Sequence, residues 1–247
     1  MRPRLVERAA GAGPVSGVVT LRPGRGRPLF LVADALGTTA GCRELAEALC
    51  GDRPVYGLEP VEAGGSARIE DLATQHADAV LATGPGPYLV GGWSFGAVVA
   101  HELARQLVER GEPVDKLVCL DGFVPPARRL AADPVILRDC LRLQAGVALG
   151  VGPVGGMVRR SPRLRRRFLA NISLLLRYRP RPVACRAVVF KAGVDLPAAA
   201  RLRRRLSPLY REVLVLPAGG RHWSMLRQPH VTALAAKLSS ELERAKT

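Results

Sequence analysis

The sequence predicts one α/β domain over residues 1–247, built on a mostly parallel, doubly wound sheet with a helical insertion. Three observations lead to this fold class. Short apolar runs alternate with stretches of helical spacing between residues 18 and 120. The alternation breaks over about 125–182, where helical patterns occur without a strand, and it resumes from residue 187. No internal repeat and no long linker divides the chain into smaller units.

The elements are expected in the order that a doubly wound sheet requires. Residues 1–26 are rich in Gly, Pro and Arg and hold one expected strand, Val18 to Leu21. Pro28 to Ala33 is a continuous apolar run of the kind that parallel sheets bury on both faces. We expect the other strands at Pro54 to Leu58, Tyr88 to Gly92, Lys116 to Leu120, Ala187 to Lys191 and Val213 to Leu216, and helices at Cys42 to Cys50, Ile69 to Leu81, Phe95 to Glu109 and His230 to Arg244.

The insertion at about 125–182 contains two helical patterns. One covers Pro134 to Leu149, and the other starts at Ser161-Pro162, a good N-cap followed by a first-turn proline. An insertion at this point of the chain lies over the carboxyl ends of the strands, where open α/β sheets bind ligands. We therefore expect a lid.

The composition favours a reduced, intracellular protein. Apolar residues make up 48% of the chain, which permits a large core, and 23% are charged. Met1 to Gly17 has no apolar run typical of a signal peptide. We also expect no stretch to reach the roughly 18 apolar residues that cross a bilayer. The five cysteines are widely spread and lack metal-site spacing. We expect a cytoplasmic protein with free thiols, no metal and no membrane partner.

The net charge of +16 comes almost entirely from arginine, because only four of the 37 basic residues are lysines. The arginines form two clusters, Arg159, Arg160, Arg163, Arg165, Arg166 and Arg167, and Arg201, Arg203, Arg204 and Arg205. Such a positive field favours an acidic protein or a phosphate-bearing ligand, and attracts nucleic acid without specificity. No aromatic residues are interleaved to stack bases, so no specific nucleic-acid partner is expected.

The strongest chemical signal is Gly92-Trp93-Ser94-Phe95-Gly96, which lies between an expected strand and an expected helix. A G-x-S-x-G pattern in this setting is typical of the nucleophile turn of α/β-hydrolases, where the chain bends sharply at the serine. The glycines remove side chains that would collide in the turn, and the hydroxyl is raised beside the positive end of the helix. We predict that Ser94 is an acyl-accepting nucleophile.

A serine hydroxyl needs a base within hydrogen-bonding distance to react near neutral pH. In α/β-hydrolases the triad follows the chain order Ser, acid, His, and the base lies in the loop after the last strand. Of the four histidines only His222 has this position, in a glycine-rich loop. We predict that His222 is the general base and that His76, His101 and His230 have surface or structural roles.

Two carboxylates compete for the third position of the triad. Asp121 directly follows the strand after the nucleophile strand, and Asp195 follows the next strand. Neighbouring strands are about 4.8 Å apart, so either carboxylate could reach one imidazole. We favour Asp121 because it adjoins its strand directly, and we keep Asp195 as the alternative acid. In either position the carboxylate fixes the imidazole tautomer and stabilises its charged form.

The oxyanion of acyl transfer needs two preorganised donors, each contributing roughly 3 to 4 kcal/mol. We expect the backbone N–H of Phe95 as one donor and the backbone N–H of Ala35, after the strand Pro28 to Ala33, as the other. Asp34 places a carboxyl beside this loop, and we expect it to point to solvent. A pocket-facing Asp34 would instead disfavour the oxyanion or bind a basic substrate group.

Three segments together resemble the thioesterase domains of nonribosomal peptide synthetases and polyketide synthases. They are Gly91 to Gly96, Leu120-Asp121-Gly122 with Pro125-Pro126 close behind, and Gly220 to Leu226. The resemblance spans roughly residues 18–242 except the insertion. It implies the α/β-hydrolase fold and an acyl chain that arrives as a thioester on the phosphopantetheine of a carrier protein. That chain moves to the serine and is released to water or to an internal nucleophile.

The resemblance also bears on the acid and on the oxyanion loop. It implies Asp121, whereas in the separate editing thioesterases of the same pathways the acid sits where Asp195 does. The residues around Ser94 resemble the integrated, chain-terminating type. The chain departs from the family at Ala33 to Gly37, where a His-Pro-x-Gly-Gly-like turn is usual.

Three hypotheses about function follow. The leading one is a thioesterase that offloads a peptide or polyketide chain from an acyl or peptidyl carrier protein, by hydrolysis or macrocyclisation. Beyond the carrier's phosphopantetheine it needs no cofactor. The second is an editing (type II) thioesterase that hydrolyses stalled acyl groups. The third is a non-catalytic basic binding protein, for which a complete triad would be superfluous.

Overall fold

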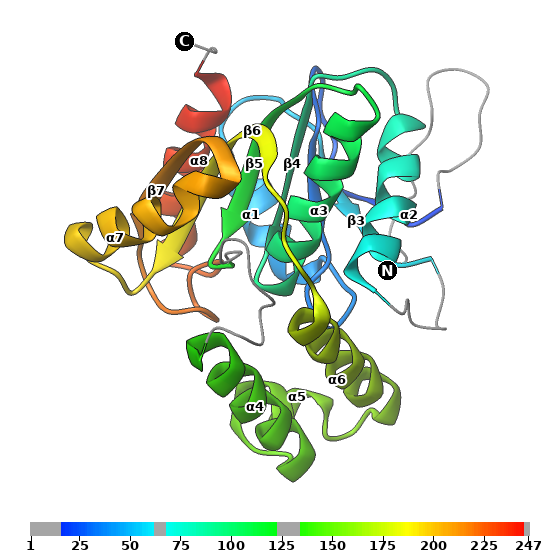
Figure 1. The fold of residues 1–247 in the computed structure, drawn as a ribbon, viewed down its shortest axis with the longest axis vertical. Coiled ribbons are helices and arrows are strands. Elements are labelled where there is room, and N and C mark those ends of the chain that lie inside the picture. The colour runs from blue at the N-terminus through cyan, green and yellow to red at the C-terminus, as the bar shows by residue number, and fades with distance from the viewer. Residues whose placement is uncertain (1–15, 62–67, 123–133, 245–247) are drawn as a thin grey trace.

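The computed structural model describes residues 16–61, 68–122 and 134–244. Within these residues seven strands form one sheet, in the order β1-β3-β2-β4-β5-β6-β7 (Figure 1). Only β1 runs antiparallel to its neighbour β3, and the other pairs are parallel. The strands are β1 (Val18–Arg22), β2 (Leu29–Val32), β3 (Val55–Leu58), β4 (Tyr88–Trp93), β5 (Val114–Leu120), β6 (Val183–Ala192) and β7 (Tyr210–Ala218).

Helices cover both faces of this sheet, as a doubly wound fold requires (Figure 1). Helices α1 and α8 pack together on one face, and α2 and α3 pack together on the other. The short η1 precedes α1, and α7 packs against β7, followed by the short η3. The bounds are η1 (Ala40–Cys42), α1 (Arg43–Ala48), α2 (Ile69–Leu81), α3 (Phe95–Glu109), α7 (Leu196–Leu206), η3 (Ser207–Leu209) and α8 (His230–Glu243).

Successive side chains of the central strands enter two separate cores. Phe30 and Val32 of β2 belong to the core beneath α2 and α3, whereas Leu29 and Leu31 belong to the core beneath α1 and α8. All four are at most 2% exposed. Because both faces of the sheet are covered, these strands have continuous apolar sequences rather than alternating ones. This confirms the predicted mostly parallel α/β fold.

The register of the central strands brings three polar residues together at the carboxyl edge of the sheet. Trp93 of β4 lies opposite Leu120 of β5, and Leu120 lies opposite Phe190 of β6. Ser94 and Asp121 directly follow their pairing positions, and Lys191 follows Phe190 within β6. The three residues are therefore neighbours across adjacent strands.

The insertion between β5 and β6 forms helices beyond the carboxyl ends of the strands (Figure 1). They are α4 (Pro134–Leu149), α5 (Gly152–Val158) and α6 (Pro162–Arg177). Helix α6 begins where the sequence predicts, and its N-cap Ser161 accepts a hydrogen bond at Oγ from the Leu164 amide, at 3.3 Å. Helices α5 and α7 were not predicted. The first part of the expected lid, with Pro125-Pro126, lies outside the described residues.

One stretch of the insertion, Leu137–Val158, is long and apolar enough to cross a membrane by length and composition, contrary to our expectation from the sequence. In the structure this stretch turns back on itself: α4 ends at Leu149 and α5 begins at Gly152. The amide of Val151 donates to the Gly146 carbonyl at 2.8 Å, which closes the turn. The segment therefore consists of two short helices packed side by side.

Candidate active site

Ser94 occupies a strained turn between β4 and α3. Its φ of 58° and ψ of −119° lie where a side chain is rarely tolerated, and its amide donates to the Leu120 carbonyl at 3.0 Å. A Cβ atom on Gly92 would lie 2.3 Å from the Gly96 carbonyl carbon, and one on Gly96 would lie 2.3 Å from the Val32 oxygen. Both glycines are thus required, and the strain holds Ser94 at the start of the helix.

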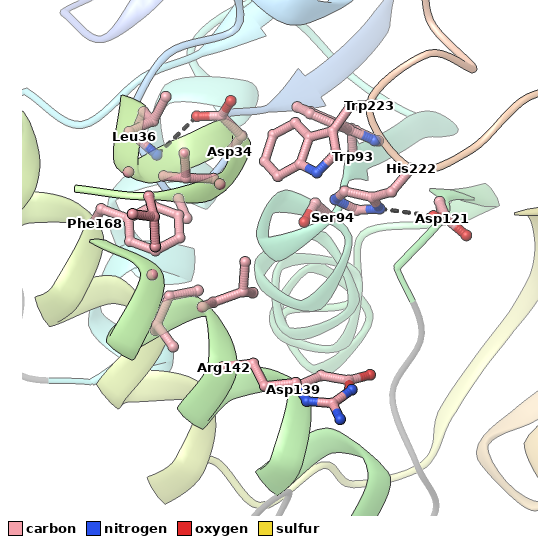
Figure 2. A pocket seen from close by; sticks show the side chains of 18 of the residues that line it. Asp34, Leu36, Trp93, Ser94, Asp121, Asp139, Arg142, Phe168, His222 and Trp223 are labelled. Carbon is pink, nitrogen blue, oxygen red and sulfur yellow. Dashed lines mark hydrogen bonds and ion pairs between the residues drawn. The ribbon is translucent and has the colours of Figure 1, made fainter. Parts of the chain in front are cut away.

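Asp121 and His222 form a hydrogen-bonded pair next to Ser94. The Asp121 Oδ2 atom lies 2.7 Å from His222 Nδ1, so the other ring nitrogen, Nε2, is available to the serine. Figure 2 shows Ser94 beside the imidazole, with Asp121 on its far side. Burial acts to raise the pKa of Asp121, but the hydrogen bond from His222 and the charge of Lys191 outweigh it, so the pKa lies below its usual 3.8. The pair has the arrangement of a base and its orienting carboxylate.

Buried residues anchor the loop that carries His222, and two tryptophans contact its ring. Met225 and Leu226 are buried in the core beneath α1 and α8. The imidazole stacks on Trp93, with ring centroids 5.0 Å apart, and meets Trp223 edge-on at 4.9 Å. These contacts fix the ring plane, so the position of Nε2 is set by packing as well as by Asp121.

The alternative acid, Asp195, has a different place in the structure. It is exposed, it does not line the pocket, and its Oδ1 accepts from the Ala198 amide at 2.7 Å as the N-cap of α7. Of the other histidines, His76 and His101 are buried, and burial lowers the pKa of each to about 4. His230 begins α8. In the part of the chain that the structure describes, neither Asp195 nor any of these histidines lines the pocket that holds Ser94.

Two backbone N–H groups remain available for an oxyanion. Among the described residues, neither the amide of Phe95 at the start of α3 nor the amide of Ala35 has an acceptor, while those of Asp34 and Leu36 do. The first amides of a helix have no partner within it and attract negative charge. Lid helix α6 fixes the second loop, because Asn171 Nδ2 donates to the Ala35 carbonyl at 3.0 Å.

The chain is similar to thioesterase domains of known proteins. A family model described as "Thioesterase domain" matches residues 27–134. The non-reducing polyketide synthase PKS16 of Cladonia grayi is 34% identical over 172 residues, which are 66% of this chain and 8% of that protein. The structure of the NocB thioesterase domain, a covalent complex with a fluorophosphonate nocardicin G analogue, has 29% identity and a TM-score of 0.72 over 92% of this chain and 100% of that domain.

The chain carries a thioesterase domain, which the family model matches over residues 27–134. The relatives and solved structures that it resembles belong to polyketide synthases and nonribosomal peptide synthetases, and the thioesterase family implies a hydrolase. A further relative, orsellinic acid synthase ArmB of Armillaria ostoyae, is 41% identical over 104 residues, which are 40% of this chain and 5% of that enzyme. The thioesterase domain thus matches only a small part of the length of these synthases.

The thioesterase domain encloses a cavity of about 520 Å³ between the sheet edge and the lid. Ser94, Asp121 and His222 lie in its wall on the sheet side (Figure 2). The lid side is mostly apolar and is formed by Leu143, Gly146, Val151, Gly152, Val154, Gly155, Phe168 and Ile172, with Asp139 and Arg142 at the end far from Ser94. A cavity of this size and lining suits an apolar acyl chain.

The expectation that Asp34 points to solvent is wrong. Its side chain is half-buried and lines the cavity, and its Oδ1 accepts from the Leu36 amide at 2.8 Å (Figure 2). Burial raises the pKa of Asp34 from its usual 3.8 to about 6, although the amides of Leu36 and Thr38 act to lower it. The carboxyl is drawn inward because it closes the turn of the oxyanion loop, a common use of aspartate in loops.

Asp34→Asn is expected to stabilise the thioesterase domain at pH 8 and to leave its stability unchanged near pH 3. Because the folded pKa of about 6 lies above the usual 3.8, folding favours the neutral carboxyl, and ionisation at higher pH lowers stability. Asparagine keeps the oxygen that accepts from Leu36 and cannot ionise. The free energy of unfolding in urea should rise by about 1 to 3 kcal/mol at pH 8. An equal gain at both pH values would contradict this origin.

One residue of the site was not predicted as a member of it. Lys191 lies 2.5 Å from Asp121 Oδ1 through its Nζ atom. The sequence does carry a signal for it, because Lys191 ends the expected strand Ala187 to Lys191, next to the strand that ends before Asp121. A charged residue at that place in a strand that is otherwise apolar indicates a partner at the sheet edge.

Proposed function

We propose that the thioesterase domain releases a peptide or polyketide acyl chain from the phosphopantetheine thioester of a carrier protein, through an ester on Ser94. The observation that supports it is the 2.7 Å pair of Asp121 and His222 in a cavity whose wall also carries Ser94 on its strained turn. The NocB thioesterase domain forms a covalent complex with a fluorophosphonate analogue, which is consistent with a nucleophile in this family.

In the first half-reaction the Ser94 hydroxyl adds to the thioester carbonyl while His222 Nε2 accepts its proton. The carbonyl oxygen becomes an oxyanion, to which the amides of Phe95 and Ala35 donate. The tetrahedral intermediate collapses with cleavage of the carbon–sulfur bond. The phosphopantetheine sulfur leaves with the proton from the imidazolium, and the acyl group stays on Ser94.

In the second half-reaction the ester is attacked by water or by a hydroxyl or amine of the acyl chain itself. His222 takes the proton of the attacking group and then returns it to the Ser94 oxygen as that bond breaks. Attack by water gives a free acid, and attack by a group of the chain itself gives a ring. No metal or cofactor of the domain takes part in either half-reaction as we propose it.

The structure favours chain release over the editing function. In editing thioesterases the family resemblance places the acid at the position of Asp195, yet here Asp195 caps α7 and Asp121 contacts His222. The relatives that the chain matches are also large polyketide synthases, which carry their thioesterase within one chain. We therefore favour an integrated or chain-terminating role.

The proposed carrier partner is supported by the charge of the lid. The chain has no acidic residue between Asp139 and Asp195, and the exposed face of α6 carries Arg163, Arg165 and Arg166. Phe168 and Ile172 of the same helix line the cavity that an acyl chain would enter. An acidic carrier protein with its phosphate group would be attracted to the exposed face of α6. The five cysteines are all free thiols, which supports our proposal of a cytoplasmic location.

The double charge reversal Arg163→Glu/Arg166→Glu is expected to raise KM for an octanoyl-loaded carrier protein about 10-fold at low salt, with kcat within twofold. Turnover of octanoyl-pantetheine should be unchanged, because it has no protein surface to bind. Release of free thiol measures both reactions. The increase in KM should shrink in 0.5 M salt, where charges are screened.

The matched control is Arg201→Glu/Arg204→Glu on α7, which changes the net charge equally but lies away from the lid (Figure 1). An equal rise in KM for both variants would contradict local docking on α6.

The mass of the product shows whether water or a group of the chain receives the acyl carbon, since a chain with a terminal hydroxyl gives an acid by hydrolysis and a lactone by cyclisation. If wild type releases no thiol from either thioester, the proposed function itself is rejected.

A further inference from the structure

Lys191 shares the catalytic carboxylate with the base. The two oxygens of Asp121 have separate partners: Oδ2 faces His222 Nδ1 at 2.7 Å, and Oδ1 receives Lys191 Nζ at 2.5 Å and the Ala192 amide at 3.1 Å. The Asp121 side chain is 4% exposed and that of Lys191 is 24% exposed. Strand β6 thus supplies two donors to one oxygen and leaves the other for the imidazole.

The backbone at Asp121 makes this support necessary. Its φ of 46° is uncommon for a residue with a side chain, and its amide is held by the Phe190 carbonyl at 2.8 Å. In the described part of the chain, the contacts that orient the carboxylate come from β6 and from His222. Without a donor on Oδ1, the carboxylate could rotate about its Cβ–Cγ bond and lose alignment with the ring.

We propose that Lys191 is a positioning residue for acyl transfer, which orients the Asp121 carboxylate toward His222 and sets the charge that the protonated base experiences. This inference rests on the proposed function, because it assigns His222 the role of base. Lys191 acts through Asp121 and needs no contact with the acyl chain.

The charges around the imidazole define what Lys191 does. Asp121 faces Nδ1, Lys191 lies on the other oxygen of Asp121, and Asp34 interacts with the ring across the cavity, while the packed side chains Trp93 and Trp223 are uncharged. While His222 is neutral, Lys191 and Asp121 cancel. When His222 takes the serine proton, the ammonium opposes that new charge. Removal of Lys191 therefore makes the protonated ring more favourable.

Lys191→Met is expected to lower kcat for octanoyl-pantetheine about 10-fold, because a misaligned base loses catalytic efficiency, with KM within twofold. The acid limb of the kcat/KM profile should also move to higher pH by about one unit. Without the nearby ammonium, the ring of His222 is protonated more easily, so activity is lost at a higher pH. Lys191→Arg keeps the charge and should restore the wild-type position of the acid limb. A purely structural role would not move this limb.

The rate at which a fluorophosphonate labels Ser94 gives the same pH profile without any thioester. It therefore separates failure of this inference from failure of the proposed function. Lys237→Met, an exposed lysine of α8, is the matched control and should behave like wild type. If Lys191→Met does not fold, Lys191→Gln replaces it with the same expected shift. An unchanged kcat and acid limb, or a change confined to KM, would overturn the assignment.

Discussion

Replacement of Ser94 by alanine is expected to lower kcat/KM for octanoyl-pantetheine by about 10⁴-fold or more, while the domain stays folded. The hydroxyl is the atom that the acyl chain is proposed to join, and the remaining residues cannot form the ester. What activity remains would come from binding and from the oxyanion amides alone. Alanine also lacks the bulk to disturb the turn between Gly92 and Gly96. A loss of activity is therefore due to the missing hydroxyl and not to a change in the fold.

Covalent labelling gives this prediction a second, independent measurement. A fluorophosphonate should add its mass to the wild-type chain at Ser94. In Ser94→Ala, the peptide that contains position 94 should remain unlabelled. Ser240→Ala, on an exposed position of α8, is the control and should be labelled and turned over like wild type. Full thioester turnover by Ser94→Ala would eliminate the nucleophile assignment and with it the proposed function.

The parts of the site that could be predicted from the sequence are those with local signals. Ser94 was identified from five consecutive residues between a strand and a helix, and the structure places it on a turn with φ of 58°. His222 was selected by its place in the loop after the last strand. Local pattern favoured Asp121 but left Asp195 as an alternative, because both follow strands. The register of β5 with β6, and the loop that brings in His222, are long-range features.

The unpredicted helices show how composition can hide a helix. In α7 the run of arginines was interpreted as charge, although Asp195 caps the helix, a proline lies in its first turn, and Ala199 and Leu206 are buried on one side. In α5 three glycines weaken the helical signal. Yet a Cβ on Gly155 would lie 2.4 Å from the Gly146 oxygen, so glycine is what lets α5 approach α4. The same residue lowers local propensity and permits tertiary contact.

Asp34 was expected in solvent, and no role in the site was predicted for Lys191. For both residues the partner that decides the placement is not apparent from the local sequence. The Leu36 amide turns Asp34 inward, and Asp121 holds Lys191 at the sheet edge. Both partnerships arise from loop conformation or strand register rather than from sequence pattern.

Asp121→Asn is expected to lower kcat by about 10³- to 10⁴-fold, and the contacts on its two oxygens explain why. Lys191 Nζ and the Ala192 amide are both donors, so they select the amide oxygen of the new side chain. The NH₂ group must then face His222 Nδ1. A donor at that position forces the proton of the neutral ring onto Nε2, which can no longer accept the serine proton.

The matched variant is Asp195→Asn, which makes the same chemical change one strand away. Asparagine is as good an N-cap as aspartate, so α7 should persist and kcat should remain within about twofold of wild type. Measurement of kcat for both variants on octanoyl-pantetheine therefore separates the two acids. A loss confined to Asp195→Asn would reverse the assignment and favour the editing type, because the residue that contacts His222 in the structure would then be dispensable for the reaction.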